Sequence, residues 1–260
     1  MKEGYEVLYQ RPKALLNTRM HYCPGCFHST MHKLLMEVVD ELDIQEKTIG
    51  VCPVGCSVFA YDYMDVDMQE AAHGRAAAVA TGIKRVLPDR IVFSYQGDGD
   101  LAAIGTAETL HACNRGENFT FIFINNGIYG MTGGQMAPTT LLGMKATTAP
   151  LGREARREGF PLDISGLVAA IPGSAYVVRT AVNSPAAVRN TKKAIRQAFE
   201  CQLDDEGFSL VEVVSQCPTN WKMDTITACK WIDEEVTEHY PLGVLQDSRK
   251  KAERKKKGKK

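Results

Sequence analysis

The chain has 260 residues, and its 31 Lys and Arg residues balance its 31 Asp and Glu residues, so the formal net charge is zero. This length suits one large α/β domain or two small ones, with enough residues for a buried core. No apolar run approaches the roughly 20 residues that span a bilayer, and the N-terminal residues lack the apolar core of a signal peptide. We therefore expect a cytoplasmic protein that does not cross a membrane.

Two closely spaced cysteine pairs lie in the first quarter of the chain. Cys23 and Cys26 form the motif CPGC, a tight turn before an amphipathic helix predicted over residues 27–42. Cys52 and Cys56 follow in the segment VCPVGCSV. Because the chain has eight cysteines and no secretion signal, we expect ligation rather than a disulfide framework.

The residues alone leave three uses for these thiols open. The four cysteines of the two pairs have a spacing that suits a structural zinc site. The CPGC pair alone could be a redox dithiol. An iron–sulfur cluster needs four thiolates without fixed spacing, and it could also use Cys217 in the segment SQCPTN. Spacing alone slightly favours zinc.

The alanine-rich residues 67–87 predict a helix that ends before Pro88. They contain the motif HGR, in which His73 has a near-neutral reference pKa. A single His among alanines is usually a hydrogen-bonded core residue, so structural support and a role in substrate binding or proton transfer both stay open. Arg75 is a further candidate for contact with a carboxylate or a phosphate.

The most informative stretch of the chain is a predicted strand, helix and strand. Apolar runs at residues 91–95 and 119–124 predict the strands, and residues 101–114 between them predict the helix. Two strands joined in this way are parallel and nearly adjacent, so both end at the same edge of the sheet. Open parallel sheets bind their ligands at that edge.

Oxygen donors follow both of these strands. The motif GDGD at residues 97–100 ends the first strand, and an Asn pair at residues 125–126 ends the second. Asp98 and Asn126, with a backbone carbonyl and phosphate oxygens, can complete the octahedral coordination that Mg²⁺ demands. The glycines allow close approach to a phosphate, and the helix starting near Leu101 points its N-terminus at the same place. GDG followed after 25 residues by NN is the pattern of thiamine-diphosphate enzymes.

The second half of the chain continues the alternation of strands and helices. We predict strands at residues 175–182 and 208–214, and between them a helix that is capped by Ser184, starts at Pro185 and reaches about Leu203. The alternation predicts an α/β fold with a doubly wound, mainly parallel sheet.

The domain organisation is predicted from the remaining segments. We expect residues 1–248 to form a single domain, with a helix-bearing extension from about residue 218, and residues 138–153 to form a long functional loop. Residues 249–260 hold nine Lys or Arg and one Glu, and we expect a solvated, disordered tail. Docking on an acidic partner, or nonspecific contact with nucleic acid, is the functional alternative for this tail.

Motifs from residue 18 to residue 243 resemble the β subunit of the 2-oxoacid:ferredoxin oxidoreductases. Several such motifs in the right order are more specific than any one of them. They are HYCPGC at 21–26, PVGCSVFAY at 53–61, AAHGRAAAVATGIK at 71–84, YQGDGD at 95–100, NNGIYGMTGGQMAPTT at 125–140 and CPTNW at 217–221. The resemblance implies the thiamine-diphosphate-binding fold, and within it the diphosphate-binding domain.

The resemblance also implies one 4Fe–4S cluster on this subunit. Its ligands would be Cys23, Cys26, Cys56 and Cys217. Cys52 is then an additional cysteine, and of Cys52 and Cys56 we favour the latter as the ligand. Glycine commonly follows CPGC in relatives, and we have no functional account of the phenylalanine found here.

The resemblance further implies how thiamine diphosphate is held. Mg²⁺ would be bound by the side chains of Asp98 and Asn126 and by the carbonyl of Ile128. The other residues implied to lie at the cofactor are Cys56, Ser57, His73, Gly97, Gly99, Asp100, Tyr129, Gly130, Met131 and Thr132. His73 is the candidate catalytic residue. Because Cys56 and Ser57 are neighbours, cluster and cofactor would lie within short electron-transfer range.

The implied activity is the oxidative decarboxylation of a 2-oxoacid with coenzyme A to acyl-CoA and CO₂, with electrons passing through the cluster to ferredoxin. Two motifs, PVGCSVFAY and MTGGQMAPTT, most resemble members that act on 2-oxoisovalerate, and 2-oxoglutarate is the second choice. This length accommodates the diphosphate-binding domain alone. The Glu that activates thiamine, most substrate contacts and the coenzyme A site are therefore expected on partner α or γ subunits.

One alternative belongs to a different class of protein. A nonenzymatic module stabilised by zinc, with its basic tail on nucleic acid, would explain the cysteine pairs and the tail. It would leave the GDG and NN motifs and Cys217 without a use, so we do not expect nucleic acid as a partner.

Overall fold

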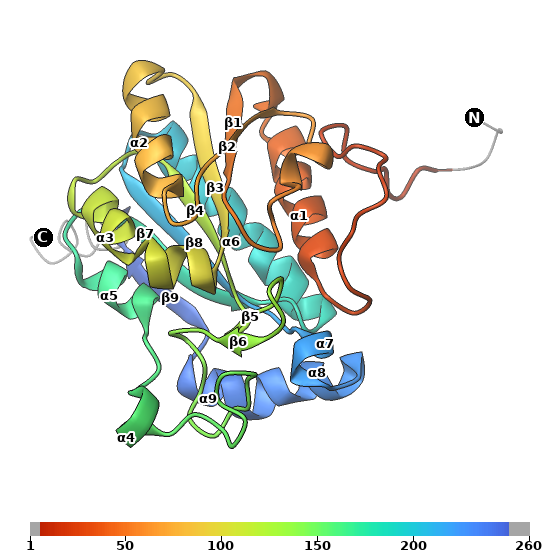
Figure 1. Ribbon diagram of the computed structural model, residues 1–260. Helices are drawn as coiled ribbons and strands as arrows, with labels where there is room; N and C mark the ends of the chain where they lie inside the picture. The colour runs from red at the N-terminus through yellow and green to blue at the C-terminus, as the bar shows by residue number, and fades with distance from the viewer. Residues whose placement is uncertain (1–5, 250–260) are drawn as a thin grey trace, which may run out of the picture.

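The computed structural model describes residues 6–249, in which apolar runs rich in Val, Ile and Phe build a seven-stranded sheet (Figure 1). The strand order is β2-β1-β3-β4-β8-β7-β9, and each neighbouring pair is parallel except β7 with β9. The strands are β1 (Thr48–Cys52), β2 (Asp67–Glu70), β3 (Ile91–Gly97), β4 (Thr120–Asn125), β7 (Ser174–Ala181), β8 (Phe208–Val214) and β9 (Gly243–Asp247). The mainly parallel sheet predicted from the sequence is confirmed.

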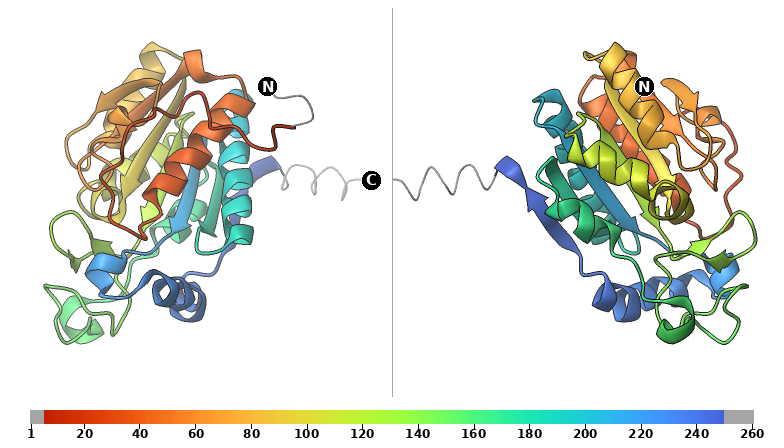
Figure 2. Two further views of the ribbon diagram at one scale, coloured as in Figure 1. Left: turned by 90° about the vertical axis from the view of Figure 1, so that its right-hand side faces the viewer. Right: turned by 60° about the vertical axis from the view of Figure 1, so that its left-hand side comes forward.

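Helices cover both faces of this sheet (Figure 2). One face packs on α1 (His28–Glu41) and α6 (Pro185–Leu203), and the other on α2 (Ala76–Val86), α3 (Thr106–Asn114) and α5 (Ile164–Ala170). The shorter elements are α4 (Ala155–Glu158), α7 (Pro218–Trp221), α8 (Thr225–Trp231), α9 (Thr237–His239), and the antiparallel pair β5 (Ile128–Tyr129) and β6 (Gln135–Met136). The fold is doubly wound, as expected.

The two hydrophobic cores follow from the alternation of side chains along each strand. On β4, Phe121 and Phe123 point to the core under α2, α3 and α5, whereas Ile122 and Ile124 point to the core under α1 and α6. All four side chains are buried. Burial on both faces explains why the central strands read as continuous apolar runs rather than as alternating patterns.

The helix predicted over residues 67–87 is wrong in its first part. Asp67–Glu70 forms strand β2 beside β1, and the helix begins only at Ala76. Gly74 separates the two elements, with φ +77°, in the left-handed region that glycine adopts readily. A β carbon on Gly74 would also lie 2.8 Å from the backbone nitrogen of Gly105, so this turn needs a glycine.

The helix predicted over residues 101–114 is divided in two. Asp100–Ile104 forms a π-helical turn, and α3 begins at Thr106. Gly105 lies between them because a β carbon there would stand 2.5 Å from the carbonyl oxygen of Asp100. A π-helical turn next to the GDGD motif is consistent with a functional site, where such turns are often found.

The cap predicted for α6 is present and offers a direct test of local stability. Ser184 Oγ accepts a hydrogen bond from the backbone nitrogen of Ala187 at 3.2 Å, and Pro185 is the first helical residue. We expect Ser184→Ala to lower the free energy of unfolding by about 1 kcal/mol, because a helical N–H then loses its partner. Chemical denaturation of the two proteins measures this difference. Ser184→Asp should keep most of the stability, and an alanine variant as stable as the wild type would contradict the capping role.

The C-terminal extension packs beneath the carboxyl end of the sheet, near β5 and β6 (Figure 1). Between β6 and α4, residues 138–153 contain isolated β-bridges but no helix or strand. Buried Arg153 holds this loop together, since its guanidinium donates to the carbonyls of Pro138, Thr140 and Phe160 at 2.7 Å each.

The predicted basic tail at residues 249–260 lies outside the described residues except for Arg249, which pairs with Glu206. Within residues 6–249, none of the helices has the length and apolarity that crossing a membrane would require.

Candidate functional site

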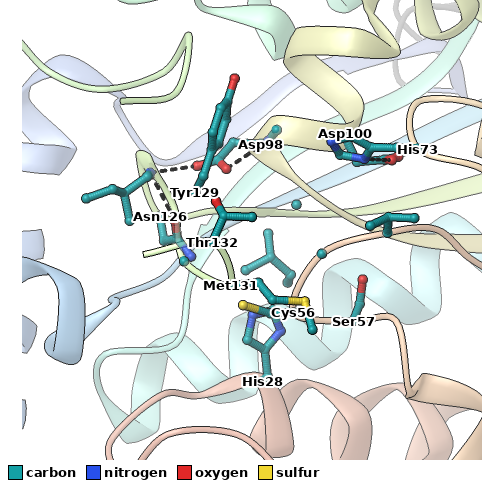
Figure 3. Close-up of a pocket in the computed structure, with 17 residues that line it drawn as sticks. His28, Cys56, Ser57, His73, Asp98, Asp100, Asn126, Tyr129, Met131 and Thr132 are labelled. Atoms are coloured by element: carbon teal, nitrogen blue, oxygen red, sulfur yellow. Dashed lines mark hydrogen bonds and ion pairs between the residues drawn. The ribbon is translucent and has the colours of Figure 1, made fainter. Parts of the chain in front are cut away.

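A cavity of about 180 Å³ opens where β3 and β4 end. Every residue that the sequence predicted to lie at the cofactor lines this cavity (Figure 3). Four lining residues were not predicted, namely His28, Val54, Gly55 and Ile124. The structure therefore brings the CPGC helix, the GCS turn, the HGR segment, the GDGD turn and the NN loop to one place.

Asp98 and the Asn pair meet as predicted, because β3 and β4 are adjacent and parallel. The Asp98 carboxylate is buried, and its two oxygens accept hydrogen bonds from the backbone nitrogens of Gly99 at 2.8 Å and Ile128 at 3.0 Å. The side-chain oxygen of Asn126 accepts from the same Ile128 nitrogen at 3.1 Å. The oxygens of Asp98 and Asn126 thus converge on the start of β5.

The donor set fits a divalent cation. In the described part of the chain no Lys, Arg or His forms an ion pair with Asp98, although this carboxylate is buried. Burial raises the pKa of Asp98 to about 7, and the backbone hydrogen bonds from Gly99 and Ile128 offset only part of that rise. A buried carboxylate without a cationic partner is costly. A hard cation such as Mg²⁺, bound through oxygen, would neutralise it.

Asp100 has a different role from Asp98. Its buried carboxylate accepts hydrogen bonds from the backbone nitrogen of Gly74 and the Gln96 amide at 2.6 Å, and it contacts His73 Nδ1 at 2.7 Å. Burial raises the pKa of Asp100, while these hydrogen bonds lower it. Asp100 therefore ties the HGR segment to the end of β3 and orients the His73 ring beside the cavity.

Arg75 does not line the cavity. Its guanidinium pairs with Glu108 at the start of α3. The structure therefore gives the suggested contact of Arg75 with a ligand carboxylate or phosphate no support.

Four thiols gather on the other side of the cavity. A β carbon on Gly130 would stand 3.2 Å from Sγ of Cys56 and 3.5 Å from Sγ of Cys217, so these two sulfurs flank the same residue. Burial raises the pKa of Cys56 to about 12 and that of Cys26 to about 11, and the neighbouring thiols, Cys23 and Cys217 among them, add to both rises. The Cys56 and Cys217 sulfurs therefore lie close together, and Cys23 and Cys26 lie near enough to act on the Cys56 thiol electrostatically.

Cys52 stands apart from this group. It is fully buried at the end of β1, and its thiol faces the carbonyl of Gln69 at 3.9 Å. Its pKa is raised by burial and by the charge of Glu70, without a contribution from the other four thiols. Across residues 6–249, no three His, Cys, Asp or Glu side chains are arranged to hold a single metal ion.

Comparison with known proteins bears directly on this arrangement. Residues 53–213 match the family model of the C-terminal TPP binding domain of thiamine pyrophosphate enzymes. The 2-oxoglutarate synthase subunit KorB of Methanocaldococcus jannaschii is 42% identical over 200 residues, which are 76% of this chain and 69% of that protein. This chain belongs to the 2-oxoacid:ferredoxin oxidoreductases, as their thiamine-diphosphate-binding subunit.

Other relatives show both the extent and the limits of the likeness. The ketoisovalerate oxidoreductase subunit VorA of Methanothermobacter thermautotrophicus is 45% identical over 240 residues. That match covers 92% of this chain and 50% of VorA, so this chain spans about half the length of that relative. The structure is also similar to a 2-oxoglutarate:ferredoxin oxidoreductase from Magnetococcus marinus with 2-oxoglutarate, coenzyme A and succinyl-CoA bound. The TM-score is 0.75 at 26% identity, over 94% of this chain and 87% of that one.

In this oxidoreductase subunit the C-terminal segment packs against the loops that line the site. Asn220 Nδ2 donates to the carbonyl of Gly130 at 3.0 Å and to Cys217 Sγ at 3.2 Å. Trp221 Nε1 donates to the carbonyl of Asn126 at 3.1 Å. The residues after Cys217 thus contact both the thiol group and the NN loop, which the sequence alone did not predict.

His28 is the main lining residue that sequence reasoning missed. Its Nδ1 lies 2.7 Å from the hydroxyl of Tyr95, and its ring stacks on Tyr22 with 4.7 Å between ring centroids. Burial lowers the pKa of His28 to about 4, so the ring is neutral at physiological pH. The sequence pattern after CPGC placed this residue in the predicted helix but gave no signal that it lies at the cavity.

Proposed function

We propose that this chain holds Mg²⁺–thiamine diphosphate and a 4Fe–4S cluster within an enzyme that oxidatively decarboxylates a 2-oxoacid. Coenzyme A takes the acyl group, CO₂ leaves, and ferredoxin takes the electrons. The observation that carries the proposal is the position of Gly130, which lies beside Cys56 and Cys217 and also lines the cavity of Asp98 and Asn126. Residues 1–248 would act as one cofactor-binding domain in the cytoplasm.

The oxygen donors and the loops around them suit the diphosphate end of the cofactor. Asp98, Asn126 and the carbonyl of Ile128 would bind Mg²⁺, and the turn at Gly97 and Gly99 would approach the phosphates. Thiamine diphosphate supplies an electron sink for the decarboxylation when it is bound. The chain's own contribution is to hold the diphosphate, to orient the cofactor along residues 129–132 and to exclude water with its apolar lining.

The four grouped thiols suit a cluster better than a single ion. A 4Fe–4S cluster takes four cysteine thiolates, and the grouped set is the one that the family resemblance implies. The zinc alternative requires Cys52, whose thiol faces Gln69 instead. Cys56 and Ser57 are adjacent and both line the cavity, so the cofactor and the cluster would lie within a short distance for electron transfer.

A partner subunit would complete the site. Asp98 and Asp100 are the carboxylates that line the cavity, and no Glu of the described residues lines it that could activate the thiamine ring. At the cavity Val54 is 42% exposed and Met131 is 49% exposed. Exposed apolar side chains at a site often mark an interaction surface. The partner α or γ subunit would cover them and bring the activating Glu and the coenzyme A site.

The part of the site that this chain contributes is better suited to a branched-chain substrate than to 2-oxoglutarate. Its apolar members are Val54, Ile124, Ile128 and Met131, and no Lys or Arg lines it. The second carboxylate of 2-oxoglutarate would need a cationic partner, whereas the side chain of 2-oxoisovalerate needs only apolar contact. The alternative substrate, 2-oxoglutarate, is kept because relatives named for both activities are similar to this chain.

The substrate proposal is tested on the assembled enzyme, purified under anaerobic conditions. We expect kcat/KM for 2-oxoisovalerate to exceed that for 2-oxoglutarate by at least about tenfold, the discrimination that an uncompensated buried charge readily provides. Reduction of a low-potential acceptor with each 2-oxoacid and coenzyme A measures this. A strong preference for 2-oxoglutarate would overturn the substrate assignment and leave the cofactor assignments intact.

A further inference from the structure

Two charged residues lie in the middle of otherwise apolar, buried strands. Arg179 on β7 is opposite Glu212 on β8, and both side chains are about 1% exposed. Two buried charges cost several kcal/mol each in desolvation unless they are paired and hydrogen-bonded. The proposed mechanism gives neither residue a part. Glu212 lies on β8, next to β4, which ends at the Asn pair, and this position suggests what the two residues do.

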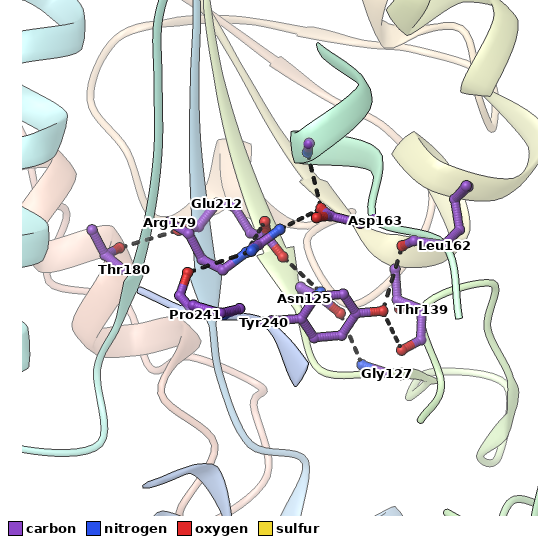
Figure 4. A network of polar contacts seen from close by, with 11 residues as sticks. Asn125, Gly127, Thr139, Leu162, Asp163, Arg179, Thr180, Glu212, Tyr240 and Pro241 are labelled. Carbon is purple, nitrogen blue, oxygen red and sulfur yellow. Dashed lines mark hydrogen bonds and ion pairs between the residues drawn. The ribbon is translucent and has the colours of Figure 1, made fainter. Parts of the chain in front are cut away.

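Glu212 joins the arginine to Asn125, the first residue of the Asn pair (Figure 4). One carboxylate oxygen, Oε2, accepts from Arg179 Nε at 2.6 Å, and the other, Oε1, accepts from Asn125 Nδ2 at 2.7 Å. The side-chain oxygen of Asn125 accepts a hydrogen bond from the backbone nitrogen of Gly127 at 3.2 Å. The amide of Asn125 is therefore held in one orientation from both ends.

A second set of contacts reaches Asp98 from the same arginine. The guanidinium of Arg179 lies over the Tyr240 ring, 5.1 Å from its centroid, and pairs with Asp163. The Tyr240 hydroxyl donates to the carbonyl of Thr139 at 3.0 Å, and the Thr139 hydroxyl lies 3.4 Å from Asp98 Oδ2. The network thus contacts both turns that carry the oxygen donors.

We propose that the Arg179–Glu212 pair positions the Mg²⁺ site by fixing the Asn125 amide and, through it, the backbone from residue 125 to residue 128. This inference rests on the proposed function, because Mg²⁺–thiamine diphosphate is the ligand whose donors, Asn126 and Ile128, lie in that segment. Glu212 and Arg179 are positioning residues, since neither lines the cavity. Residues behind metal ligands commonly change metal affinity 10–100-fold when they are mutated.

The chemistry of the pair makes a sharp test available. A carboxylate accepts hydrogen bonds on both oxygens, whereas a glutamine amide accepts on its oxygen and donates from its nitrogen. In Glu212→Gln the charged Arg179 keeps the amide oxygen, so the amide nitrogen faces the nitrogen of Asn125. Asn125 must then turn over or withdraw, and in either case its hydrogen bond with Gly127 is lost.

A compensating substitution should restore the arrangement. With aspartate at position 125, one carboxylate oxygen can accept from the new glutamine nitrogen and the other from the Gly127 nitrogen. The double variant Asn125→Asp with Glu212→Gln therefore keeps every contact and the total charge. Asn125→Asp alone places two carboxylates against each other, and we expect it to be at least as defective as Glu212→Gln.

The experiment uses the assembled enzyme, stripped of cofactor with a chelator and then incubated with thiamine diphosphate over a range of Mg²⁺ concentrations. The readout is the thiamine retained after gel filtration, so no turnover is needed. We expect the Mg²⁺ concentration for half-maximal retention to rise at least about tenfold in Glu212→Gln and to return to within about threefold of wild type in the double variant.

Glu117→Gln is the matched control. Glu117 is a largely buried carboxylate paired with Arg85 and Arg115, and it precedes β4 at the end opposite to Asn125. We expect this variant to keep the wild-type Mg²⁺ midpoint even where its thermal stability falls. If Glu212→Gln does not fold, Asn125→Ala leaves the buried ion pair intact and should show the same shift.

The outcomes of this experiment distinguish the proposed function from the positioning role of Arg179 and Glu212. A wild-type enzyme that retains thiamine diphosphate without any dependence on Mg²⁺ would overturn the proposed function, and this inference with it. Mg²⁺-dependent retention that is unchanged in Glu212→Gln and Asn125→Ala would overturn the positioning role alone. A double variant no better than Glu212→Gln would also contradict it.

Discussion

We expect the replacement of Asp98 by alanine to weaken severely the retention of Mg²⁺ and thiamine diphosphate by the assembled enzyme. Asp98 is the one acidic side chain at the cavity whose oxygens meet the Asn126 side chain at Ile128. Burying the Asp98 carboxylate without a cationic partner costs free energy, and a bound metal ion would offset that cost. We expect the Mg²⁺ concentration for half-maximal retention to rise by at least about 100-fold, more than for a residue behind the ligands.

The measurement for this first prediction is the thiamine and magnesium content of protein freed of unbound ligand. Asp98→Asn, which keeps one oxygen and the volume of the side chain, should fall between the wild type and alanine. Glu117→Ala removes another buried carboxylate far from the cavity and should leave the thiamine content unchanged. Wild-type thiamine content in Asp98→Ala would mean that Asp98 is not a ligand.

We expect Cys217→Ala to lose the proposed cluster and Cys52→Ala to keep it. Cys217 and Cys56 flank Gly130, and the two thiols of CPGC belong to the same group. Cys52 faces the Gln69 carbonyl instead, and its pKa is raised by burial and Glu70 rather than by the other thiols. Because a 4Fe–4S cluster needs four thiolates, losing one of the four should cost the whole cluster.

The second prediction is measured as the difference in iron and sulfide between each variant complex and the wild-type complex under anaerobic conditions. Cys217→Ala should lack about four iron and four sulfide per chain, with a matching loss of visible absorbance. Cys52→Ala should lack none. The reverse result, with Cys52 required and Cys217 dispensable, would restore the ligand set of the zinc alternative.

The part of the fold that the sequence predicted best has the strongest pattern. Strand β8 occupies the residues predicted for it, since FSLVEVV is buried on both faces and is apolar except at Ser209 and Glu212. Strand β2 was missed because its sequence, DMQE, is mostly exposed and has no apolar pattern. Its place is set by backbone pairing with β1, and a sequence pattern does not record such pairing.

The residues of the candidate site also include some that the sequence predicted and some that it could not. Asp98 and Asn126 could be predicted because each directly follows a recognisable strand, and topology brings strand ends together. His28 could not be placed at the cavity, since its contact with Tyr95 joins residues 67 positions apart. The contacts of Asn220 and Trp221 with the site likewise depend on how the C-terminal segment folds back.

Glu212 and Arg179 show a signal that was present in the sequence but not used. Each is the single charged residue in a strand that is otherwise apolar or uncharged. Such a violation of the apolar pattern usually marks a paired or functional group. Which group it contacts depends on the strand order β4-β8-β7, which the sequence did not predict.

The central claim is that one chain places a thiamine diphosphate site next to an iron–sulfur cluster, and cofactor analysis of the anaerobically purified complex tests it most directly. We predict a brown protein in which each copy of this chain accounts for one thiamine diphosphate and one 4Fe–4S cluster. A colourless protein with stoichiometric zinc and no thiamine would contradict the account.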